Sequence, residues 1–133
     1  MINLHDVKAG DTVIVEYEGE KHEGLVLEVN REDKQVCVQT GEQEFWYELA
    51  DVYSIPLNEE QLLRLKFTKE DISPDPDNRR IYVRGPFSVM FHDLDGHEAT
   101  RLDYRDEHRE IKGALTVNQL QNHYHEMTNF HLD

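Results

Sequence analysis

The chain has 133 residues, of which 38% are hydrophobic and 32% are charged, and its formal net charge is −14. This length allows one domain, or two very small packed modules, with a modest hydrophobic core. The acidic balance argues against nucleic-acid binding, because a phosphate backbone would be repelled rather than neutralised by lysine and arginine. Solubility explains the charge most simply, and an acidic surface for a basic partner is the alternative.

The sequence also indicates a cellular compartment. No apolar run approaches the ~20 residues that cross a bilayer, and no signal peptide precedes the polar N-terminus. The single cysteine, Cys37, excludes an intramolecular disulfide and a cysteine-based zinc site. We therefore expect a cytoplasmic protein that does not bind membranes.

Short strands joined by tight turns are expected in the first part of the chain. Alternating apolar residues and turn residues predict strands over residues 12–17, 22–30, 35–40 and 44–48. Residues 49–57 complete this module. Four or five strands within about fifty residues suggest a small barrel. The pattern G-D-x-V-x-V that begins at Gly10 resembles SH3-like barrels of the Tudor and KOW kind.

Two later segments begin with the same helix-capping pattern. Asn58 and Thr116 can each accept a hydrogen bond from an unpaired amide of a first helical turn. Gln61 and Gln119 follow three residues later, where a capping box requires them. The flanking hydrophobic staples are Leu57 with Leu62 and Leu115 with Leu120. The pattern predicts one helix that ends near Phe67 and a second that presents Val117, Leu120, Tyr124 and Met127 on one buried face.

The segment between these helices is expected to consist of strands and turns. Pro74 and Pro76 predict a polar loop over residues 73–78. Strands are predicted over residues 80–85, 87–92 and 97–104, with a hairpin turn at Asp93–Gly96. Residues 106–112 are charged and show no clear pattern.

Both capped segments resemble a known family. Ile55–Phe67 is similar to the element "IPLTEEWLLKFGF", and Val117–Leu132, with Gln119–Asn122 reading QLQN, is similar to "VHQLQNLYFALTGEEL". These elements mark a family of small uncharacterised proteins from Bacteroidetes-type bacteria and their phages. The resemblance covers roughly the last two thirds of the chain and carries no catalytic residue across. The chain departs from the family pattern at Lys66, Asn118, His123 and His125.

No catalytic, metal or cofactor site is expected. The His-Glu pairs at His22, His97 and His125 lack the second histidine that the H-E-x-x-H zinc motif requires. Cys37 lies in a predicted strand, without a helix N-terminus or glycine turn to lower its pKa. Ser88 has no nucleophile-elbow motif around it. A small metal-dependent hydrolase remains a disfavoured alternative.

Aromatic residues form the candidate interaction surface. Phe45, Trp46 and Tyr47 are consecutive, and with Tyr17 and Tyr53 they could form a cage for a methylated cation, as in Tudor-like barrels. Strand alternation puts Phe45 and Tyr47 on one face and Trp46 on the other, and one of these faces must supply the core. The residues selected as an interaction surface are Trp46, Tyr17 and Tyr53.

The sequence thus predicts an α+β, mainly β protein. An SH3-like barrel at residues 1–57 is expected to pack on an α+β module at residues 58–133, with hairpins and two helices, in one cooperative unit. The second helix is expected to cover the second module, and Leu63 or Leu65 to contact the barrel. We expect a non-enzymatic protein-interaction protein of phage or prophage type with a protein partner. The alternative is an acidic inhibitor that mimics nucleic acid in a host enzyme's basic cleft.

Overall fold

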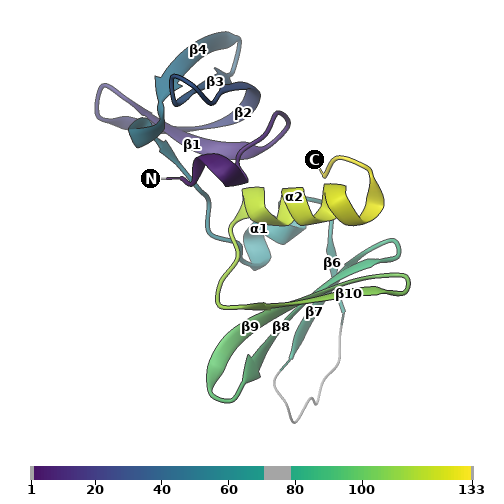
Figure 1. The fold of residues 1–133 in the computed structure, drawn as a ribbon. Helices are drawn as coiled ribbons and strands as arrows, with labels where there is room; N and C mark the ends of the chain where they lie inside the picture. The colour runs from purple at the N-terminus through teal and green to yellow at the C-terminus, as the bar shows by residue number, and fades with distance from the viewer. Residues whose placement is uncertain (1, 71–78, 133) are drawn as a thin grey trace. The chain divides into compact units, whose positions relative to one another are not determined.

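The computed structural model describes residues 2–70 and 79–132, shown as a ribbon in Figure 1. Over these residues the fold is mainly β, with two five-stranded antiparallel sheets and two α-helices. It divides into two compact units: Met1–Pro56 with Thr116–Asp133, and Leu57–Leu115. The loop predicted at residues 73–78 lies outside the described residues. Within the described ranges, no helix is long and apolar enough to cross a membrane.

The first unit contains a sheet with the strand order β4-β3-β2-β1-β5. Four predicted strands are confirmed within two residues at each end, and residues 49–53 add a short 3-10 helix and a fifth strand. The edges of the sheet are β4 and β5, so it stays open where the sequence predicted a barrel. The elements are η1 (Leu4–Asp6), β1 (Thr12–Tyr17), β2 (Glu20–Asn30), β3 (Gln35–Thr40), β4 (Gln43–Glu48), η2 (Leu49–Asp51) and β5 (Val52–Tyr53).

The long strand β2 is shared between its two neighbours. Its first half pairs with β1 as far as Leu25, and its second half pairs with β3, with a register shift between Val26 and Glu28. Gly24 lies where the two pairings meet. A Cβ atom on Gly24 would lie 2.5 Å from Cγ1 of Val38 and 2.9 Å from the carbonyl oxygen of Gln39. Only glycine therefore fits this position without displacing β3.

One face of this sheet supplies the core of the first unit. Strand alternation puts Val13 and Val15 of β1 on the same face as Val36 and Val38 of β3, and all four are fully buried. Burying each such side chain contributes about 1.5–3 kcal/mol. The core of the first unit consists of Ile2, Val7, Val13, Val15, Val26, Val36, Val38, Tyr47 and Val52.

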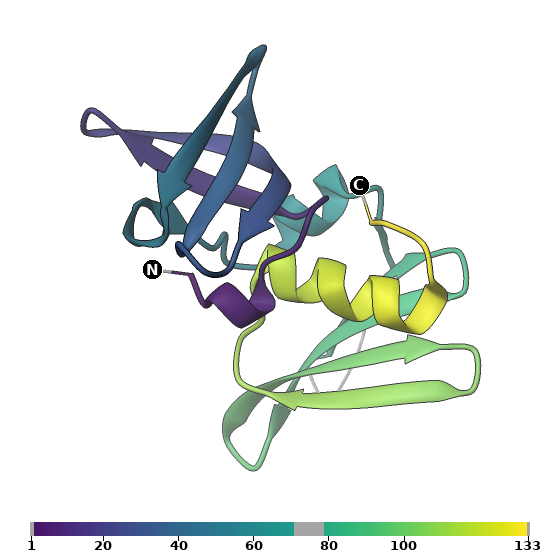
Figure 2. The same cartoon turned by 45° about the horizontal axis from the view of Figure 1, so that its top comes forward.

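The second helix, α2 (Val117–Thr128), belongs to this first unit, where it contacts β1 and η1 (Figure 2). The predicted capping box is confirmed, because the side chains of Thr116 and Gln119 each accept from the other residue's backbone N–H. Pro56 and Thr116 form an isolated antiparallel bridge. The sequence-based boundaries assign this helix to the second module, and the structure differs. Chain proximity suggested that assignment, whereas long-range hydrogen bonds to residues 6 and 12 decide the packing.

The second unit has a plain meander with the strand order β10-β9-β8-β7-β6. Its buried face includes Tyr82, Phe87, Val89, Phe91 and Leu102. The hairpin between β8 and β9 turns at Asp95 and Gly96, both with positive φ, as a two-residue turn requires. Residues 107–112 prove to be a strand. The elements are α1 (Glu59–Arg64), β6 (Thr68–Lys69), β7 (Arg80–Arg84), β8 (Phe87–Leu94), β9 (His97–Tyr104) and β10 (Glu107–Lys112).

Helix α1 begins at the predicted cap but has only half of the capping box. The Asn58 side-chain oxygen accepts from the Gln61 N–H at 3.0 Å. The Gln61 side chain accepts from Arg64 at 3.4 Å instead of the backbone of Asn58. Of the two leucines expected to contact the barrel, Leu65 is buried and Leu63 is half exposed.

Candidate interaction surface

Three rings at one end of the first sheet form what we term the aromatic rim: Tyr17, Phe45 and Tyr47. Tyr17 and Phe45 stack with their ring centroids 6.2 Å apart and their planes 8° from parallel. Tyr47 meets Phe45 edge-on at 6.5 Å. Tyr17 and Phe45 are 58% and 49% exposed, whereas Tyr47 is buried. The rim is therefore the point where the core reaches solvent.

The stack depends on the curvature of the sheet. Tyr17 is on β1 and Phe45 is on β4, and two strands lie between these in the sheet order. Both side chains lie on the core face, since Tyr17 alternates with Val15 and Phe45 alternates with Tyr47. Only a strongly curled sheet can bring its first and fourth strands into ring contact.

An open hollow of about 560 Å³ lies against the aromatic rim. Aromatic faces attract cations through their quadrupole, and a nearby carboxylate adds to this attraction. The hollow has the first of these features, because Tyr17, Phe45 and Tyr47 line it, and residue Glu23 also belongs to its lining. The remaining lining residues are His22, Thr40, Gly41 and Gln43.

The structure separates the three residues selected from the sequence. Tyr17 joins the rim, whereas Trp46, which is 46% exposed, and Tyr53 lie on the opposite face of the sheet. The Tyr53 hydroxyl donates to Glu16 at 3.0 Å, and this hydrogen bond raises the pKa of Tyr53. The ammonium group of Lys21 lies 4.7 Å from the centroid of the Tyr53 ring. Both the hydroxyl and the ring of Tyr53 therefore already have partners within the chain.

The residues of β2 and of the β3–β4 turn that line the hollow were not identified from the sequence. His22 and Glu23 belong to the half of β2 that pairs with β1, and Gly41 lies in the hairpin turn. No local motif marks them, because they reach the rim only through the bend of β2. The available signal was Gly24, a glycine inside a strand pattern, which indicates a close approach of backbones.

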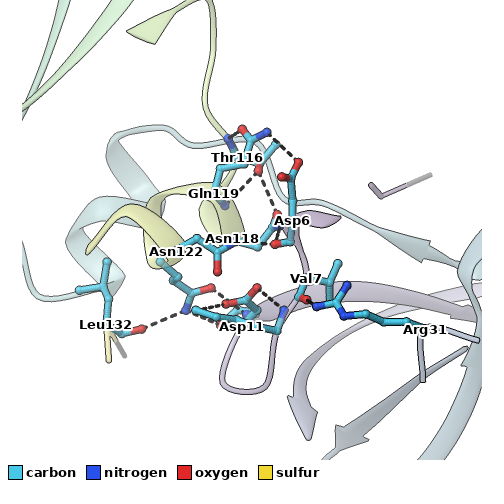
Figure 3. Close-up of polar contacts among 12 residues, drawn as sticks. Asp6, Val7, Asp11, Arg31, Thr116, Asn118, Gln119, Asn122 and Leu132 are labelled. Carbon is cyan, nitrogen blue, oxygen red and sulfur yellow. Dashed lines mark hydrogen bonds and ion pairs between the residues drawn. The ribbon is translucent and has the colours of Figure 1, made fainter. Parts of the chain in front are cut away.

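A second polar cluster holds α2 in place (Figure 3). The Gln121 side-chain oxygen accepts from the Thr12 N–H at 2.8 Å, and its amide donates to the Thr12 hydroxyl at 3.1 Å. The same amide donates to the Leu132 carbonyl at 3.0 Å. Asn118 and Asn122 both donate to the Asp6 carbonyl. The QLQN segment therefore has a structural role, since its amides join the helix to η1 and β1.

Asp11 is the buried acid among the described residues of this unit. Its side-chain oxygens accept from the Lys8 ammonium at 2.8 Å and from the Lys8 backbone N–H at 3.0 Å. Burial raises the pKa of Asp11 above its usual range, and the interactions with Lys8 oppose this shift. Both oxygens are engaged in the turn, so Asp11 shapes the start of β1.

The second unit gathers charged residues on the face of its sheet opposite the core. Asp103 contacts Arg101 and His108, and His92 lies 2.6 Å from Glu110. Ser88 pairs across the strands with Asp103. The acid therefore lies between the serine and His108, whereas a catalytic triad needs the histidine in the middle.

The thiol and the possible metal ligands of the described residues give no further site. Cys37 is buried, and burial raises the pKa of its thiol, which favours the less nucleophilic form. Residues 2–70 and 79–132 contain no group of three His, Cys, Asp or Glu side chains that could hold a metal ion.

A scan against protein-family models, a search of curated proteins and a search of solved structures found no match to this chain.

Proposed function

We propose that this protein is a non-enzymatic, acidic protein-interaction module that binds a basic segment of a partner at the aromatic rim. The observation that carries the proposal is the exposed stack of Tyr17 on Phe45 beside the hollow. Exposed rings that gather at one place, rather than singly, mark contact surfaces. Covering these rings would remove apolar area from water without rearranging the core.

The charge around the rim supports a basic partner. Glu23 lines the hollow, and Glu42 and Glu44 flank the β3–β4 turn beside it. A lysine or arginine over an exposed ring contributes about 0.5–2 kcal/mol, depending on how far it is desolvated. The net charge of −14 would also accelerate the approach of a cationic partner at low ionic strength.

The proposal retains three expectations from the sequence. These are an SH3-like origin for the curled first sheet, a phage or prophage setting, and a cytoplasmic location. The bent β2 shared between two neighbours supports the first, and the Ile55–Phe67 and Val117–Leu132 elements support the second. The lone Cys37 favours the third.

An NMR titration of the full chain tests the proposal. The probe is the peptide Thr-Lys-Thr-Val-Thr-Lys-Thr, with its glutamate counterpart as a charge control. We expect shifts at Tyr17, Phe45 and Tyr47 with the lysine peptide alone, and weaker binding by Phe45→Ala. Phe130→Ala is the matched control, because Phe130 is also exposed but lies outside the rim.

Two results would contradict the proposal. The first is no binding of the lysine peptide. The second is an equal loss of peptide affinity in Phe45→Ala and Phe130→Ala. It would mean that the acidic charge alone attracts the peptide, as expected of a nucleic-acid mimic.

A further inference from the structure

Among the described residues, no strand pairs with one side of the β4 backbone. It is an edge of the first sheet, and its only neighbour there is β3 (Figure 1). The Leu49 N–H donates to the Lys34 carbonyl at 3.1 Å, in register with the pair Val36 and Tyr47. Hydrogen-bonded pairs alternate in an antiparallel ladder. The N–H and C=O groups of Tyr47 and Phe45 therefore face β3, and those of Glu44, Trp46 and Glu48 face away from it.

Exposed rings border this free edge on both faces. Phe45 lies on the core face at the rim, and Trp46 lies on the opposite face. Edge strands are usually protected against pairing by charged side chains, especially lysine, by proline or by a bulge. Strand β4 has no lysine or proline, its charged side chains are both acidic, and its register with β3 is regular over all six pairs.

The charge pattern selects the kind of strand that fits. On the outer face, Glu44, Trp46 and Glu48 follow one another at alternate positions, so an aromatic ring lies between two carboxylates. A second copy of β4, paired antiparallel about Trp46, would place Glu44 against Glu48. Like charges directly opposite each other destabilise a sheet. A segment with lysine or arginine at two alternate positions and an apolar residue between them is complementary instead.

We propose that β4 binds an extended basic segment of a partner protein as a sixth strand of the first sheet. The backbone of the segment pairs with the outward groups of Glu44, Trp46 and Glu48, and its two cations face the carboxylates of Glu44 and Glu48. The Gln35 side chain on β3 donates to Oε1 of Glu48 at 2.9 Å, so the incoming cation is expected to meet the other oxygen of this carboxylate. The inference rests on the proposed function and adds the mode of binding to it: the paired segment borders Phe45 of the rim on the core face and carries its two cations on the opposite face.

Strand pairing is distinguished from side-chain binding by a matched pair of substitutions. Glu44→Pro removes an outward N–H and a carboxylate, and it breaks no bond to β3. Glu44→Ala removes the carboxylate and keeps the N–H. With the lysine peptide as probe and Trp46, the only tryptophan, as the fluorescent reporter, we expect Glu44→Pro to bind about tenfold more weakly than Glu44→Ala.

Amide hydrogen exchange of the wild-type chain provides a measurement that does not depend on folding of the proline variant. Bound peptide should slow exchange at Glu44, Trp46 and Glu48 and leave Phe45 and Tyr47 unchanged. Peptide binding without this protection, or with equal affinities of the two variants, would overturn strand pairing and leave the proposed function intact. No binding at all would overturn both. A dimer that Glu44→Pro dissociates would show that a second copy occupies the edge.

Discussion

The two sheets end in edge strands of six residues, β4 and β10, which differ in how their charges are used. Strand β10 has two acids and two bases, and Arg109 pairs with Glu107 at 3.1 Å while Glu110 meets His92. No large hydrophobic side chain is exposed on it. Strand β4 has two acids, no base and two exposed rings. On β10, acids and bases pair with one another within the sheet. On β4, acids without bases lie beside exposed rings, so this edge favours a strand that carries basic and apolar side chains.

The interiors of the two units also differ, in how many polar side chains they bury. In the described chain the first unit buries Asp11, Asn118 and Gln121, whereas the second buries Thr100 as its single polar side chain. The buried amides of the first unit hold a helix on a curled sheet through specific hydrogen bonds. The polar groups of the second unit pair instead on an exposed sheet face.

The largest expected effect comes from matched core truncations. Leu120 of α2 and Leu102 of β9 are both fully buried. Replacing either with alanine should lower the free energy of unfolding by about 2–5 kcal/mol. Residues 53–57 contain no flexible spacer, so we expect one cooperative transition in urea for both variants. Two separate transitions, each shifted by only one substitution, would show that the units unfold independently.

A smaller loss is expected when the buried amide is removed. Gln121→Ala leaves the Thr12 N–H and the Leu132 carbonyl without their partner. Each unsatisfied buried group costs about 1–3 kcal/mol. Glu110→Ala on the surface of the second unit is the counterpart, and an exposed ion pair contributes at most about 1 kcal/mol. Equal losses in urea titrations would remove the distinction between buried and surface polar groups.

Gly24→Ala tests the bend that separates the curled sheet from the plain meander. Its methyl group would collide with Val38 and with the backbone of Gln39. We expect the free energy of unfolding to fall by about 1–3 kcal/mol, together with chemical-shift changes at Tyr17 and Phe45. Leu25→Ala is the control, because Leu25 is exposed and its truncation should lower the free energy of unfolding by less. A stable Gly24→Ala variant with an unchanged rim would show that the curl has another origin.

The smallest effect is the pH dependence contributed by Asp11. Burial raises its pKa, so the folded state binds this proton more tightly than the unfolded state does. The stability that protonated Asp11 contributes is present at low pH and is lost as the pH rises through the folded-state value. The unfolding free energy of the wild type minus that of Asp11→Asn should therefore fall as the pH rises above about 4. A difference that grows with pH would mean that Lys8 outweighs burial.

Local patterns predicted most of the fold. Period-two alternation located β1, β3 and β9 to the residue, and the cap at Thr116 located the start of α2. Strand β10 was not assigned, because its neighbours across the sheet are charged pairs rather than an alternating apolar face. Local patterns also could not assign α2 to its unit, since Gln121 and Thr12 are more than one hundred residues apart.

The candidate site was predicted only as a set of residue types. Phe45 and Tyr47 were placed on one face correctly, but Trp46 and Tyr53 were grouped with Tyr17 because all three are aromatic. Which rings meet depends on the curvature set near Gly24, and alternation along a single strand contains no information about curvature.

The discontinuous first unit has a consequence for how the protein is made. Residues 57–115 lie in the chain between the first sheet and α2, so a ribosome must synthesise the whole second unit before the helix that completes the first one. At about 5–20 residues per second, this delay is roughly 3–12 s. Throughout that time the nascent first sheet lacks the Leu120 side chain and the Gln121 amide. The unit that starts first is therefore the last that can finish folding, and its β1 surface is where a chaperone would find the nascent chain.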